Sequence, residues 1–292
     1  MRGLALSAPR RNFAGIVLDS LPWLAQSLAR PLACAFVVWG CWAAGAAAAR
    51  ADNAFPNSQS VLLPRDRPDE IVVATTFGLV FSVDDGATWR YACEDLQTTT
   101  GGRKYFVGPP PANRIFALSD LGIPVSNDGA CTWTIAGGDV TAMSPFDVFP
   151  DPADPLRAYA LAKAPNDPDE TTGSAYRSFD GGRTFAGPIF TAPPSSVLTG
   201  IESAASDPMT VYLTFYELAA NGVHPRLATS RDGGDTWTTA DLEARLGSLI
   251  PRLAAVDPTD PARILLRISS GGGDPAAVDG LVLTTDGGTT FA

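Results

Sequence analysis

The sequence predicts an all-β protein, specifically a β-propeller built of four-stranded blades. An eight-residue pattern, Ser/Thr-x-Asp-x-Gly-x-Thr-Trp/Phe, occurs five times, with starts 44, 52, 52 and 54 residues apart. Around each copy, short apolar runs rich in β-branched and aromatic residues alternate with turns of Asp, Pro and Gly. The chain also carries 28 Gly and 25 Pro, which suits a turn-dense fold. Four short strands in about 50 residues are typical of one propeller blade.

The first 51 residues differ from the rest and predict a signal peptide. Arginines precede an uncharged run at 32–49, and Ala49-Arg50-Ala51 offers a small-residue cleavage site. This order predicts an exported protein, located in the periplasm, at the cell surface or outside the cell. The alternative is a retained membrane anchor, because 18 uncharged residues just reach spanning length.

Removal of residues 1–51 makes the chain strongly acidic. Five of the 21 basic residues and one of the 31 acidic residues lie in this segment, which leaves 16 basic and 30 acidic residues. Such a surface repels nucleic acid and anionic lipid, so neither is expected as a partner, and no membrane insertion is expected after cleavage. With His224 as the single histidine, we expect neither a metal site nor a cofactor.

Two cysteines, Cys93 and Cys131, remain after cleavage, and in an exported chain they predict one disulfide. The bond would close a loop of 38 residues. In the chain-entropy model such a loop contributes about 3–4 kcal/mol of stability.

The repeated pattern, called the box below, has the chemistry of a hairpin turn. Its Asp can accept hydrogen bonds from N–H groups one or two residues on, and its Gly supplies a positive φ. The final aromatic residue resumes a strand and should turn into the core. We therefore expect structural, not catalytic, roles for the boxes; in the second, Ala130 takes the Gly place. Their key residues are Asp84, Gly86, Trp89, Asp128, Trp133, Asp180, Gly182, Phe185, Asp232, Gly234, Trp237, Asp286, Gly288 and Phe291.

Each repeat reads as strand, Asp/Pro turn, strand, variable loop, strand, box, strand. This places five blades in a propeller at 52–292, and a short surface helix is expected within 239–250, where leucines have helical spacing. The last box ends at Phe291, so the fifth blade lacks its fourth strand, and we expect the sequence to be a fragment of a larger propeller. The blades span about 58–96, 103–140, 145–192, 197–242 and 250–292.

The boxes and their spacing resemble the BNR or Asp-box repeat of sialidases, sortilin-type receptors, some plant-polysaccharide hydrolases and photosystem assembly factors. The resemblance covers the whole chain after residue 51. It implies a propeller in which the box is a structural turn remote from any active site. It does not imply one activity, because fold does not determine function.

Function is expected on the face opposite the boxes, where loop sequences vary. The second-to-third loops are short in the first two blades and long at 162–174, 217–225 and 269–280. These long loops predict an interaction surface for a protein or a glycan. Their candidate residues are Asp167, Asp169, Glu170, Glu217, His224 and Asp274.

The expected function is a binding or scaffold module, and the alternative is a sialidase-like glycoside hydrolase. Sialidases carry an arginine triad and a Tyr/Glu pair, with an Arg-Ile-Pro signature before the first box. No Arg-Ile-Pro stands there in this chain. Tyr216 and Glu217 are adjacent, but consecutive strand residues point to opposite faces. Arg103, Arg177 and Arg226 are the arginines from which a triad would have to be built, and no catalytic residue is assigned.

Overall fold

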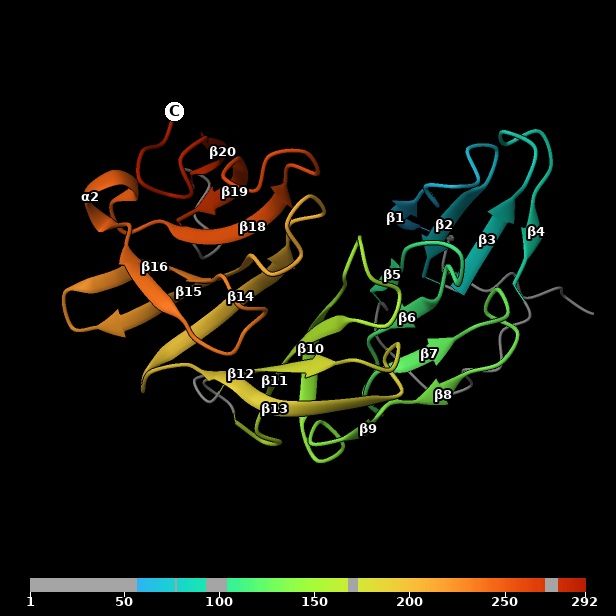
Figure 1. Cartoon of the computed structure of the whole chain (residues 1–292), viewed down its shortest axis with the longest axis horizontal. Helices are drawn as coiled ribbons and strands as arrows, with labels where there is room; N and C mark the ends of the chain where they lie inside the picture. The colour runs from blue at the N-terminus through green and yellow to red at the C-terminus, as the bar shows by residue number, and fades with distance from the viewer. Residues whose placement is uncertain (1–56, 77, 93–103, 168–172, 271–277) are drawn as a thin grey trace, which may run out of the picture. The chain divides into compact units, whose positions relative to one another are not determined.

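The computed structural model describes residues 57–76, 78–92, 104–167, 173–270 and 278–292. The predicted signal peptide at 1–51 lies outside these residues. The fold class is confirmed: five antiparallel sheets follow one another along the chain and are arranged as a five-bladed β-propeller (Figure 1).

The first two sheets have four strands each, hydrogen-bonded in chain order. They are β1 (Ser58–Leu62), β2 (Ile71–Thr75), β3 (Gly78–Ser82) and β4 (Arg90–Tyr91), then β5 (Tyr105–Val107), β6 (Ile115–Ala117), β7 (Pro124–Ser126) and β8 (Thr134–Ile135).

The third and fourth sheets have longer strands. They are β10 (Ser144–Pro150), β11 (Ala158–Lys163), β12 (Ser174–Ser178) and β13 (Thr184–Thr191), then β14 (Ser196–Ser203), β15 (Val211–Ala219), β16 (Gly222–Ser230) and β17 (Thr238–Asp241). A short strand that the sequence did not predict, β9 (Gly137–Gly138), adds to β13 in parallel. A Cβ on Gly138 would lie 2.3 Å from the Phe185 carbonyl oxygen, so only glycine fits there.

The fifth sheet has three described strands, as the sequence predicted: β18 (Ile250–Val256), β19 (Ile264–Ser269) and β20 (Asp279–Thr284). Ala292 and Leu283 exchange both backbone hydrogen bonds, at 2.8 and 2.9 Å, where a fourth strand would begin. The helix expected within 239–250 is a single turn, α2 (Glu243–Leu246), because β17 takes residues up to Asp241.

The apolar core lies between successive sheets. Four buried clusters each join two neighbouring blades, for example Tyr159 and Leu161 of the third blade with Leu213 and Phe215 of the fourth. Leu246 and the residue that precedes α2, Leu242, fill the last of these clusters. Burial of such side chains favours folding by roughly 1.5–3 kcal/mol each.

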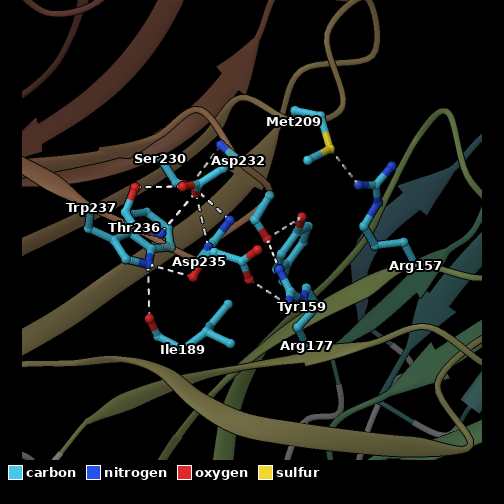
Figure 2. Close-up of polar contacts among 12 residues, drawn as sticks. Arg157, Tyr159, Arg177, Ile189, Met209, Ser230, Asp232, Asp235, Thr236 and Trp237 are labelled. Atoms are coloured by element: carbon cyan, nitrogen blue, oxygen red, sulfur yellow. Dashed lines mark hydrogen bonds and ion pairs between the residues drawn. The ribbon is translucent and has the colours of Figure 1, made fainter.

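All five boxes form the same hydrogen-bonded turn (Figure 2 shows the fourth). In that copy the Ser230 hydroxyl donates to Asp232 Oδ1 at 2.7 Å and accepts from the Gly234 N–H at 2.8 Å. Asp232 also accepts the Thr236 N–H at 2.9 Å and the Thr236 hydroxyl at 2.5 Å. The expectation that Asp would bond N–H groups one or two residues on was wrong, because the carboxylate reaches three and four residues on.

The carboxylate can accept from N–H groups three and four residues on because the residues at the fourth and fifth box positions have positive φ angles. They are 73° and 102° at Gly233 and Gly234, and the turn they make brings the Thr236 N–H to the carboxylate. In the second box, Gly129 and Ala130 have φ of 71° and 70°. The turn therefore forms with alanine in place of glycine, at the steric cost of a left-handed non-glycine residue.

The box aromatics do not all enter the core, contrary to expectation. Phe185 is buried, Trp133, Trp237 and Phe291 are half-buried, and Trp89 is 48% exposed. Trp237 Nε1 donates to the carbonyl oxygen of Ile189 in the preceding blade at 2.9 Å. The Nε1 of Trp89, in the first blade, donates to the carbonyl oxygen of Gly86 in its own box at 3.0 Å, and no described residue of another blade accepts a hydrogen bond from it.

Candidate functional site

The antiparallel strand order gives the propeller two distinct faces. The first-to-second strand turns and the boxes lie on one, called the box face. The second-to-third connections and the starts of the first strands lie on the other, called the variable face.

A cavity of about 380 Å³ opens on the variable face, where strands of the last three blades meet the residue before β5. This variable-face cavity has the size of a site for a small ligand or one end of a polymer. Its lining residues are Lys104, Phe146, Asp147, Val197, Leu198, Thr199, Tyr216, Ile250, Arg252, Arg267 and Ser269.

Basic side chains dominate the charge of this cavity. Lys104 precedes β5, Arg252 lies on β18, and Arg267 is its partner on β19. The Arg267 guanidinium is held by Asp279, at 2.8 and 2.6 Å. No described residue forms a hydrogen bond or ion pair with the Arg252 guanidinium. Arg252 is thus positioned to pair with a ligand anion.

Asp147 lies on β10, in the wall of the same cavity. Loss of hydration between the blades raises the pKa of its carboxyl to about 6, against the opposing effect of Lys104 and Arg252. The Val148 N–H donates to Asp147 Oδ1 at 3.1 Å. The cavity therefore places a carboxyl that titrates near neutral pH beside cationic groups.

Two predicted loop residues, Glu217 and His224, lie on strands. We expected a long loop at 217–225, but β15 and β16 continue as a hairpin until Ala219 pairs with Gly222, and Glu217 pairs directly with His224. This expectation was wrong because the backbone ladder extends to the tip, where Gly222 turns the chain with a φ of 130°.

The polar groups of this hairpin bind one another. Arg226 contacts Glu217 with two bonds of 3.1 Å and also pairs with Asp241. His224 contacts Glu243 at 2.7 Å and Asn221 at 3.0 Å. Tyr216 lines the cavity while its neighbour Glu217 binds Arg226, as strand alternation predicts.

The remaining predicted residues that the structure describes do not line the cavity. Asp167 lies in a turn after β11, and three others, Asp169, Glu170 and Asp274, fall outside the described residues. Arg177 lies at the box face, where it donates to the Gly233 carbonyl oxygen and to Asp235 at 2.9 Å. Arg226 is held in its hairpin, so the two described arginines, Arg177 and Arg226, do not converge, and Arg103 lies outside the described residues.

Sequence reasoning missed Lys104, Asp147, Arg252 and Arg267 as a group. A usable signal existed, because Asp147 and Arg252 are single charges within otherwise apolar first strands. A charged side chain in such a strand either faces a space between the blades or is buried, and burial of an unpaired charge costs free energy. Such a residue therefore marks a candidate site.

The predicted disulfide and the alternative membrane anchor both involve residues outside the described ranges. Cys93 lies outside the described residues, so its bond to Cys131 stays a prediction. Within the described ranges, the structure contains no helix long and apolar enough to cross a membrane.

Comparison with solved structures shows the fold. The chain is similar to a GH74 enzyme of Niastella koreensis, with a TM-score of 0.59 and 19% identity over 80% of this chain and 38% of that one. It is also similar to the GH74 xyloglucanase of Xanthomonas campestris, with a TM-score of 0.55, 19% identity and the same two shares. The chain thus matches well under half the length of these enzymes. No family model and no curated protein sequence matches it.

Proposed function

We propose that this chain is an exported Asp-box β-propeller that binds an acidic glycan in the variable-face cavity. The cavity, the cluster of cations in its wall and the glycan-active enzymes that share the fold support this proposal. The glycan group to be recognised is a carboxylate or a sulfate, because both accept paired hydrogen bonds from a guanidinium.

One observation carries the proposal: Lys104, Arg252 and Arg267 converge on one cavity of a chain whose net charge is −10. Charges of one sign spread over a surface usually serve solubility. Here the positive charges, which are the fewer in this chain, are concentrated in a concave site, where low-dielectric walls focus their electric field. An anionic ligand is attracted there despite the acidic surroundings.

A binding measurement tests the proposal. The purified chain is titrated with oligogalacturonate and with neutral xyloglucan fragments of similar length. We expect oligogalacturonate to bind and Arg252→Ala or Lys104→Ala to weaken it about tenfold at low salt, the loss of one charge-assisted contact. Arg90→Ala, an exposed change on β4, is the matched control and should bind like the parent chain. Equal affinity for both sugars, or variants that bind as tightly as the parent, would contradict the proposal.

The second candidate is a sialidase-like glycoside hydrolase, and the observation that favours it is Asp147. A carboxyl with a pKa of about 6 is suited to act as a general acid near neutral pH. Tyr216 lines the same cavity. A screen on chromogenic glycosides, including acidic ones, tests this reading. Turnover that Asp147→Asn abolishes while binding persists would establish it, and turnover unaffected by that variant would exclude Asp147 as the acid.

A further inference from the structure

A second cavity opens on the box face, the face on which the sequence predicted only scaffold. Its volume is about 350 Å³, and the ends of all five first strands contribute to it, together with the turns that follow them. This box-face cavity is therefore a property of the whole propeller rather than of one blade.

The walls of the box-face cavity are apolar over about half of their surface, and their side chains include few hydrogen-bond donors. Leu62, Phe106, Phe149 and Val256 supply apolar side chains, and five prolines in or next to the first-to-second strand turns have no N–H to offer. These prolines are Pro64, Pro109, Pro150, Pro152 and Pro258. Ser203 is occupied, since its hydroxyl donates to Asp151 Oδ2 at 3.1 Å. Such walls suit a ligand with an apolar body.

Glu202 supplies the carboxylate of this cavity. It lies near the end of β14, and its Oε2 accepts the N–H of Val256 from the next blade at 3.0 Å. No other hydrogen bond to the Glu202 carboxylate is formed by the described residues. The carboxylate therefore keeps acceptor capacity toward the cavity, where Arg65 is the one basic residue among the described lining.

We propose that the box-face cavity binds a small organic ammonium ion, with its charged head on Glu202 and its apolar body against the phenylalanine and leucine walls. An ammonium group supplies the donors that the walls lack, and Phe106 and Phe149 can add a cation–π contribution. A calcium ion is a poorer match, because it requires six to eight oxygen ligands and the lining provides one carboxylate.

The electrostatics of Glu202 agree with this ligand class. Burial, together with the smaller effect of the negative charge of Asp147, raises the pKa of its carboxyl to about 7, against the opposing effect of the Val256 N–H. A bound cation favours the ionised form. Binding should therefore strengthen from pH 6 to pH 8 and release protons at the lower pH.

The test compares two probes of nearly equal shape, benzylammonium and neutral benzyl alcohol, by calorimetry on the full chain. We expect benzylammonium to bind about tenfold more tightly than the alcohol, and Glu202→Gln to remove that difference. Asp120→Asn, an exposed change on the variable face, is the charge-matched control. The probe comparison on the unsubstituted chain remains decisive if Glu202→Gln fails to fold.

Three results would overturn the inference. They are equal binding of the two probes, unchanged benzylammonium binding by a folded Glu202→Gln chain, and displacement of benzylammonium by calcium at matched ionic strength. The benzylammonium and oligogalacturonate titrations use different probes, and their test residues, Glu202 and Arg252, line different cavities. A negative result for the ammonium site can therefore be distinguished from a negative result for the proposed glycan site.

Discussion

The box carboxylates illustrate how a side chain can appear chemically active and yet be fully engaged in structure. Each of the five accepts bonds from a Thr N–H, a Thr hydroxyl and a Ser or Thr hydroxyl of its own box. Hydrogen bonds from Thr132 lower the pKa of Asp128 to about 2, and those from Thr290 do the same for Asp286. Groups held in this way are poor proton donors near neutral pH.

These depressed pKa values predict a loss of stability in acid. The unfolded carboxyls titrate near 3.8, so the box contribution is complete above that pH and is lost as pH falls toward about 2. We expect Asp128→Asn to have a lower melting temperature than the parent at pH 7, with the difference shrinking toward pH 2. Thermal melts across this range measure it, and a constant difference would contradict the account.

The boxes and the first-to-second strand turns also join neighbouring blades. Phe116, Tyr159 and Tyr212 each occupy the second position of a second strand and lie against the following blade. Tyr159 donates to the Gly233 carbonyl oxygen at 3.3 Å, and Tyr212 donates to the Pro261 carbonyl oxygen at 2.8 Å. A box glycine thus provides both a positive φ and room for a neighbouring ring.

The two roles of glycine can be separated by substitution. A Cβ on Gly182 would lie 2.3 Å from the Phe116 ring, whereas a Cβ on Gly129 would have nothing within 4 Å, and both residues have positive φ. Gly129→Ala should cost about 1 kcal/mol from backbone strain alone. Gly182→Ala should cost roughly 2–4 kcal/mol, because overpacking is added. Chemical denaturation measures both, and equal losses would contradict the blade-joining role.

The sequence predicted most of the strands because each repeat carries its own turn chemistry and alternation. The prediction failed where a strand depends on hydrogen bonds to its partner strand and not on its own composition. The tip of the β15–β16 hairpin reads as a loop from composition, yet its backbone ladder continues to Ala219. The strand β9 is two glycines whose assignment depends on β13, a partner about 50 residues later.

The two cavities arise because the propeller brings together first strands that are far apart in sequence. Asp147 lines one cavity and Glu202 the other, and the negative charge of Asp147 contributes to the raised pKa of Glu202. No local pattern contains this information, since the residues concerned come from different blades. A rule that singles out charged residues in apolar first strands would have found Asp147, Glu202 and Arg252.

This carboxyl pair predicts a second pH dependence, opposite in sign to that of the boxes. The folded pKa of Glu202 is about 7 against an ordinary value of 4.5, so the folded state holds a proton that the unfolded state has lost between these pH values. Stability should therefore fall as pH rises from about 4.5 to 7, by on the order of 3 kcal/mol. Glu202→Gln should abolish most of this fall in denaturation experiments at pH 5 and pH 8. A parent chain that is more stable at pH 8 than at pH 5 would contradict the assignment.

Recognition of a ligand anion by the variable-face cavity has a direct test in one affinity ratio. Oligogalacturonate and its methyl ester have the same backbone and differ in the charge of each carboxyl group. We predict that the parent chain prefers the free acid by about tenfold or more at low salt, and that Arg252→Ala reduces this preference while Arg90→Ala does not. Equal affinity of the parent chain for the acid and the ester would contradict the claim.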